Sequence, residues 1–148
     1  MIASTRDRVP EHTSDCVNAE IRRRTEESVA HFMAAGDAAI AARLRELDRE
    51  WDIERVLEAN ASTACLIGLT LGALKHRGFF LMPAIVAGFL LQHAVQGWCP
   101  PMPILRRLGF RTANEIDYER YALKAFRGDF QGIPGTFAPE SALAAAER

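Results

Sequence analysis

The sequence lacks the features by which most enzymes and nucleic-acid-binding proteins are recognised. It has 18 basic and 19 acidic residues, so no positive excess favours nucleic-acid binding. No glycine-rich phosphate loop, Ser/His/Asp arrangement or paired acidic motif occurs. The sequence therefore predicts no cofactor, no firm catalytic residue and no nucleic-acid partner, and it favours a protein that is not an enzyme.

Cysteine is also scarce. The three cysteines, Cys16, Cys65 and Cys99, lie far apart, which excludes a disulfide framework and a metal site built from paired cysteines. His12 lies four residues before Cys16, but two ligands do not make a metal site, so no metal is predicted. The first residues show no apolar segment after a basic start, and no cleavable signal peptide is expected.

Charge is nearly absent from the middle of the chain. Residues 59–105 carry only Lys75 and Arg77, whereas the segments on both sides carry many charges. The first uncharged run, Ala59 to Leu74, reaches ~24 Å as a helix, so it needs Val56 and Leu57 to cross a hydrocarbon core of ~30 Å.

A second run, Phe79 to Trp98, has twenty residues without an acidic or basic side chain, which is enough to cross a bilayer. Trp98 ends it where an interfacial aromatic residue is expected. The two runs predict a transmembrane helical hairpin over residues 58–109, with its turn at Lys75–Gly78.

A soluble helical bundle is the alternative to this hairpin. It would need other helices to cover Phe79–Leu91, which is apolar all round, and the remaining chain offers only charged amphipathic helices. The membrane interpretation is therefore favoured. Basic residues flank the hairpin more densely than they fill its turn, which predicts both termini in the cytoplasm of a bacterial inner-membrane protein. They are Arg43, Arg45, Arg49, Arg55, Arg106, Arg107 and Arg111.

Small residues recur at four-residue spacing in both apolar runs. Ala64, Gly68 and Gly72 form one stripe, and Ala84 and Gly88 form another. Small residues at this spacing let membrane helices approach closely. The stripes are predicted to pack against each other within the hairpin or across a dimer.

Four uncharged polar side chains fall in the half of the hairpin away from its turn: Asn60, Gln92, His93 and Gln96. They could form a proton or ligand site. An interhelical hydrogen-bond cluster is favoured instead, because the runs hold no carboxylate to partner His93.

Cys99, in Gly97-Trp98-Cys99-Pro100, is the candidate reactive thiol. It sits where a helix stops, at the expected membrane boundary. The negative partial charge of a helix C-terminus disfavours a thiolate there. A structural role and a role as a sulfur or redox carrier both remain open.

The segments before and after the hairpin are predicted to form helices and flexible tails. Residues 1–14 are polar and are predicted to be disordered, and residues 15–57 lack proline and predict one long amphipathic helix. A C-terminal helix is expected over residues 112–128, followed by loop and flexible tail over residues 129–148. One side of the long helix is apolar and could pack on its own protein, pair with a second copy or lie on the membrane. Its contact stripe is Val29, Met33, Ile40, Leu44, Leu47 and Trp51.

The stretch from Asp52 to Gly109 resembles the YgaP-like transmembrane domain, a family of small bacterial inner-membrane proteins. The resemblance lies in Ile53-Glu54-Arg55 before the first run, the ending Gly97-Trp98-Cys99-Pro100, and Ile104-Leu105-Arg106-Arg107-Leu108-Gly109 behind it. It implies a two-helix membrane hairpin, which some family members carry beside a rhodanese sulfurtransferase domain. This chain has no segment outside the hairpin that is long enough for such a domain.

Together these patterns predict an all-α integral membrane protein. A hairpin anchor in the lipid bilayer would present cytoplasmic helices for assembly with a second copy or with another membrane or cytoplasmic protein. The two alternatives are a membrane-bound thiol carrier that works through Cys99 and a soluble helical bundle.

Overall fold

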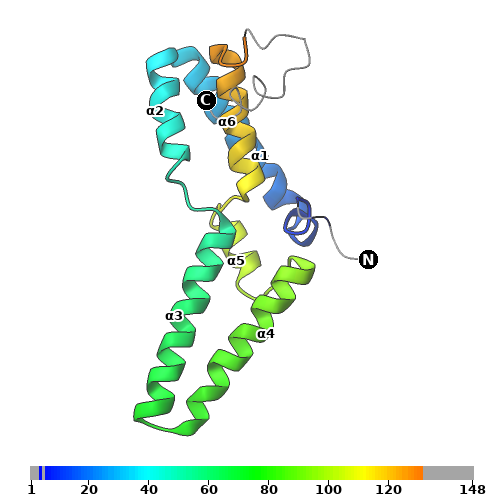
Figure 1. Cartoon of the computed structure of the whole chain (residues 1–148). Coiled ribbons are helices and arrows are strands. Elements are labelled where there is room, and N and C mark those ends of the chain that lie inside the picture. Colours follow the sequence, from blue (N-terminus) through cyan, green and yellow to red (C-terminus); the bar gives the residue numbers. More distant parts are fainter. Residues whose placement is uncertain (1–3, 5, 132–148) are drawn as a thin grey trace, which may run out of the picture. The chain divides into compact units, whose positions relative to one another are not determined.

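The computed structural model describes residue 4 and residues 6–131, and within them it contains helices and no strand (Figure 1). The all-helical class is therefore confirmed for this part of the chain. The chain divides into two compact units, Met1–Arg22 with Trp51–Asn114 and Arg23–Glu50 with Glu115–Arg148. The helices are α1 (Asp15–Ala35), α2 (Asp37–Leu47), α3 (Ile53–Leu74), α4 (Leu81–Gln96), α5 (Met102–Arg107) and α6 (Ala113–Arg127).

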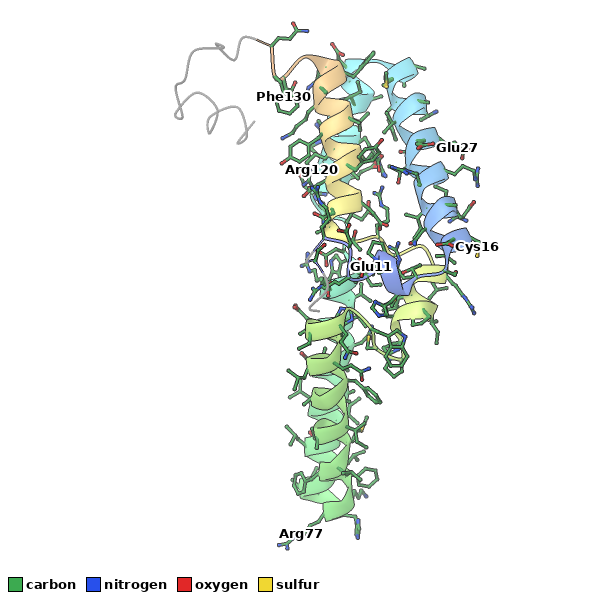
Figure 2. All side chains as sticks on the ribbon, turned by 90° about the vertical axis from the view of Figure 1, so that its right-hand side faces the viewer. Glu11, Cys16, Glu27, Arg77, Arg120 and Phe130 are labelled. Atoms are coloured by element: carbon green, nitrogen blue, oxygen red, sulfur yellow. The ribbon has the colours of Figure 1, made fainter. Side chains whose placement is uncertain are left out.

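The first unit is built on α3 and α4, which run in opposite directions from a short turn (Figure 1). The Asp52 side chain begins α3 by accepting a 2.7 Å hydrogen bond from the backbone N–H of Arg55. At the turn, Nδ1 of His76 accepts from the backbone N–H of Gly78, and Arg77 marks the tip (Figure 2). Pro83 lies in the first turn of α4, where its missing N–H breaks no helical hydrogen bond.

Both arms of this hairpin are long and apolar enough to cross a membrane. Little of either arm is buried within the protein. Of the most apolar 18 residues, 22% are buried in Ile53–Leu74 and 6% in Arg77–Gln96. Side chains project from the arms over their whole length (Figure 2). Large exposed apolar residues include Leu66, Ile67, Leu81, Ile85, Leu91 and Val95.

The arms diverge away from the turn (Figure 1), and a hydrophobic cluster fills the open end of the hairpin. Trp98, Leu105 and Phe110 pack against it. The backbone N–H of Ile53 donates to the carbonyl of Arg111, which ties the start of α3 to the segment after α5. The buried members are Val9, Ile53, Leu57, Cys99 and Met102.

The N-terminal segment takes part in this cluster. Val9 is 1% exposed, and Pro10–His12 forms a short 3₁₀ helix. The predicted disorder of residues 1–14 is therefore wrong for the described part of the segment. The reason is that Val9 supplies an apolar side chain to a core whose other members lie more than forty residues away.

The second unit packs the C-terminal part of α1, α2 and α6 around one core. The predicted single helix over residues 15–57 is wrong, because the chain breaks at Gly36 and again after Leu47. Gly36 has φ +88°, a left-handed conformation that glycine adopts without steric cost. The core residues are Ile40, Leu44, Leu47, Ile116 and Leu123.

The apolar stripe predicted along residues 29–51 thus serves mainly inside this unit. Ile40, Leu44 and Leu47 are buried, and Val29 and Met33 pack against them. Trp51 belongs to the first unit and is 46% exposed.

A buried carboxylate joins the three helices of the second unit. Glu119 of α6 is fully buried and accepts from Ser28 Oγ of α1 at 2.6 Å and from Arg43 Nε of α2 at 2.9 Å. The hydrogen bond from Glu119 raises the pKa of Arg43 above its ordinary value. Helix α6 has nearly the bounds predicted for it, and residues 132–148 of the predicted tail lie outside the described residues.

Candidate functional site

A polar network crosses the open end of the hairpin. His93 lies in the last turn of α4 and Glu54 in the first turn of α3. Nε2 of His93 donates a hydrogen bond to Oε2 of Glu54 at 2.7 Å. Nη2 of Arg8 donates to the other oxygen of Glu54 at 2.9 Å. His93 is 4% exposed, so the network joins three charged or polar side chains around a largely buried imidazole.

Arg8 also fastens the N-terminal segment to α4. Its Nη1 donates to the carbonyl of Ala94 at 2.9 Å. The last carbonyls of a helix lack partners within the helix, so a guanidinium there satisfies one of them and meets the negative end of the helix dipole.

Gly97 allows this close approach. It ends α4 with φ +79°, and a Cβ atom there would lie 2.3 Å from the carbonyl oxygen of Arg8. The backbone of residue 8 therefore occupies the space that any other side chain at position 97 would need.

Cys99 lies beside the network but is enclosed. It is 3% exposed within the hydrophobic cluster at the open end of the hairpin. Nδ1 of His93 is buried and makes no hydrogen bond of standard geometry. A thiol, an imidazole and a carboxylate therefore lie at the same end of the hairpin, and these are the residue types that serve as nucleophile, base and orienting group in cysteine enzymes.

The predicted cluster of uncharged polar residues is only partly assembled. Asn60 and Gln96 are exposed and Gln92 is half-buried, and among the described residues none of the three has a side-chain hydrogen bond. The inference that no carboxylate could partner His93 is wrong. Because α3 begins at Ile53 and not after residue 57, Glu54 stands in its first turn, at the same end of the hairpin as His93.

The two small-residue stripes do not face each other. A Cβ atom at Gly68 would lie 2.7 Å from Cδ of Pro83, and one at Gly72 would lie 2.7 Å from Cδ1 of Phe80. At Gly88 nothing lies within 4 Å, and Ala84 is exposed, as is most of its helix. The α3 stripe, of which Ala64 is the half-buried first member, therefore faces α4 near the turn, whereas the α4 stripe points outward.

The part of the chain that the structure describes holds no group of three or more His, Cys, Asp or Glu side chains that could bind a metal ion. In comparisons with known proteins, no family model matches the chain, and no curated protein or solved structure matches it either. Over its described residues the chain is thus all-helical, with an exposed apolar hairpin and, at the end of the hairpin away from the turn, a partly buried polar network around His93. The resemblance to the YgaP-like transmembrane domain stays a prediction.

Proposed function

We propose that this chain is an integral membrane protein in which α3 and α4 cross the bilayer as an anchor. The observation that carries the proposal is the exposure of the hairpin, since only 6% of the apolar window in Arg77–Gln96 is buried. Proteins in water rarely expose contiguous apolar patches of more than a few hundred Å². The core helix of a soluble bundle would be mostly buried, and these helices are not.

The dimensions of the hairpin agree with this role. As helices, Ile53–Leu74 and Arg77–Gln96 extend roughly 33 and 30 Å, against a hydrocarbon core of ~30 Å. Lys75 and Arg77 then fall at one surface and the Arg8–Glu54–His93 network near the other. At that second surface the guanidinium of Arg55 lies 4.4 Å from the ring centre of Trp51, an aromatic–cation pair suited to the interface.

The anchor would hold the second unit at the membrane for assembly, with a second copy or with another membrane or cytoplasmic protein. Basic residues before and after the hairpin favour both termini in the cytoplasm, and the resemblance to the YgaP-like family favours a bacterial inner membrane. No step of chemistry is needed for this function.

Fractionation after an alkaline carbonate wash tests the anchor. The wild-type chain should stay in the membrane pellet and dissolve only in detergent. The double variant Ile85→Arg/Phe89→Arg places two charges in the apolar arm, each costing about 2.5–3.5 kcal/mol at the centre of a membrane helix. This variant should leave the pellet. A soluble bundle would tolerate both changes, because the two side chains are exposed, and release of the wild-type chain by carbonate would contradict the anchor.

One observation favours a second candidate, a thiol carrier that works through Cys99. Cys99 lies at the same end of the hairpin as His93, whose ring is hydrogen-bonded to Glu54. In such a carrier, His93 takes the thiol proton and the thiolate attacks the outer sulfur of a persulfide donor. The donor's S–S bond breaks, Cys99 becomes the persulfide, and the donor leaves as a thiolate.

The burial of Cys99 predicts that it is not a carrier. At neutral pH a small maleimide should label Cys99 at least about tenfold more slowly than the exposed Cys16 of the same chain, since reagent must wait for the open end to unfold locally. Mass spectrometry of the two peptides gives both rates. If Cys99 and Cys16 are labelled at equal rates, and Cys99 carries a persulfide after exposure to a persulfide donor, the thiol carrier becomes the proposed function in place of the anchor.

A further inference from the structure

Helix α5 has two unlike faces. Met102 and Arg106 are buried, whereas Ile104 and Leu108 are 62% and 69% exposed. Leu108 keeps helical backbone angles as the C-cap of α5, so it lies one turn beyond Ile104 on the same side. The preceding Pro100 and Pro101 are exposed as well. α5 therefore presents an apolar outer face that no described residue covers.

The position of α5 is set by the open end of the hairpin. The chain leaves α4 at Gly97 and enters α5 at Met102, which packs in the cluster that includes Ile53 and Leu57 from the start of α3. The hydrogen bond from Ile53 to the carbonyl of Arg111 fixes the chain again just after α5. α5 is thus held level with the first turns of α3, about 30 Å along that helix from the turn.

If the hairpin crosses a bilayer, the boundary between lipid and water lies at the level of α5 and the first turns of α3. A helix lying there would bury an apolar face at the junction of headgroups and acyl chains and keep basic side chains beside it. Arg107 is exposed and stands next to Leu108, at the edge of the apolar face. Through Met102, α5 packs at the end of the hairpin away from the turn, beside the start of α3 (Figure 1).

We propose that α5 lies in the membrane interface, with Ile104 and Leu108 inserted among the outer ends of the acyl chains and Arg107 at the level of the lipid phosphates. The inference rests on the hairpin crossing the bilayer and names a further lipid-contacting surface on the same side as the polar network. A helix of six residues is too small to anchor a protein, so α5 sets how deeply the open end of the hairpin sits in the membrane.

Spin labels measure this directly. Single cysteines replace Ile104, Leu108, Ile85 or Tyr121 in the full chain with Cys16→Ser, Cys65→Ala and Cys99→Ala, and each carries a nitroxide. The proteins are reconstituted in phosphatidylcholine/phosphatidylglycerol vesicles, and circular dichroism confirms their helix content. Collision rates with oxygen, which concentrates in lipid, and with a polar nickel complex in water then give the depth of each label.

Labels at 104 and 108 should lie about 5–10 Å inside the headgroup boundary. The label at 85 should lie far deeper, and the label at 121, an exposed position of the second unit, should be in water. If the labels at 104 and 108 are as exposed to water as the label at 121, while the label at 85 is still deep, the placement of α5 is wrong and the anchor is unaffected. If the labels at 104 and 108 are shielded from both reagents, a protein partner covers α5 and its placement in the membrane is wrong. If the label at 85 is exposed to water, the anchor itself is wrong.

Discussion

Gly68→Leu is expected to force the two hairpin helices apart, whereas Gly88→Leu should leave them packed. A Cβ atom at position 68 would lie 2.7 Å from Cδ of Pro83 and 3.3 Å from the carbonyl oxygen of Phe79. A proline ring and a backbone oxygen cannot turn aside, so the helices themselves must move. Position 88 has nothing within 4 Å.

The pair is matched because both changes replace a helical glycine by leucine and gain the same helix propensity, ~1 kcal/mol. Overpacking costs typically ~1–3 kcal/mol, so Gly68→Leu should lower the midpoint of thermal unfolding in detergent and Gly88→Leu should not. Gly72→Leu should fall between them, since its neighbour is the half-exposed Phe80 ring, which can rotate away. Circular dichroism gives all three midpoints. An unchanged midpoint for Gly68→Leu would show that the α3 stripe faces lipid.

Gly97→Ala is expected to release the N-terminal segment from the open end. Both Gly97 and Gly36 have positive φ, so alanine at either position carries a backbone cost of ~1–2 kcal/mol. Only at Gly97 does the new methyl group also meet backbone, 2.3 Å from the carbonyl oxygen of Arg8. Residue 8 must therefore move, and its hydrogen bonds to Glu54 and Ala94 break with it.

Limited trypsin digestion measures this release at the bond after Arg8. Cleavage should be at least about tenfold faster in Gly97→Ala than in wild type, which corresponds to ~1.4 kcal/mol in the opening equilibrium. Gly36→Ala is the control and should be cut after Arg8 at the wild-type rate. Equal acceleration in both variants would mean that general instability, and not the contact with residue 8, governs the cleavage.

Local pattern was enough to predict helices over the two apolar runs. The uncharged runs, the polar turn at Lys75–Gly78 and the cap-forming region near Gly128 each depend on neighbours in sequence. The structure has helices over both runs and before Gly128, although α3 starts earlier than predicted. The missed start of α3 also had a local signal. Asp52 stands three residues before Arg55, the spacing of an N-cap, but the charged helix formers around it read as one uninterrupted helix.

The candidate site was only partly readable for a different reason. Arg8 and Ala94 are 86 residues apart, and Glu54 and His93 are 39 apart. Their pairing depends on where α3 starts and on how the N-terminal segment folds back, which no local period encodes. His93 was identified as a polar residue within an apolar run, whereas Arg8 stands in a polar segment with no feature to distinguish it.

The central claim is that the hairpin crosses the bilayer, and a membrane-impermeant maleimide tests it in intact bacterial cells. Arg77→Cys, in a chain with Cys16→Ser, places an exposed thiol at the tip of the turn, and native Cys16 supplies an exposed thiol on the N-terminal side. The residue at position 77 should be labelled in intact cells, and Cys16 only after the membrane is permeabilised. Labelling of both thiols from the same side of the membrane would contradict a hairpin that crosses it.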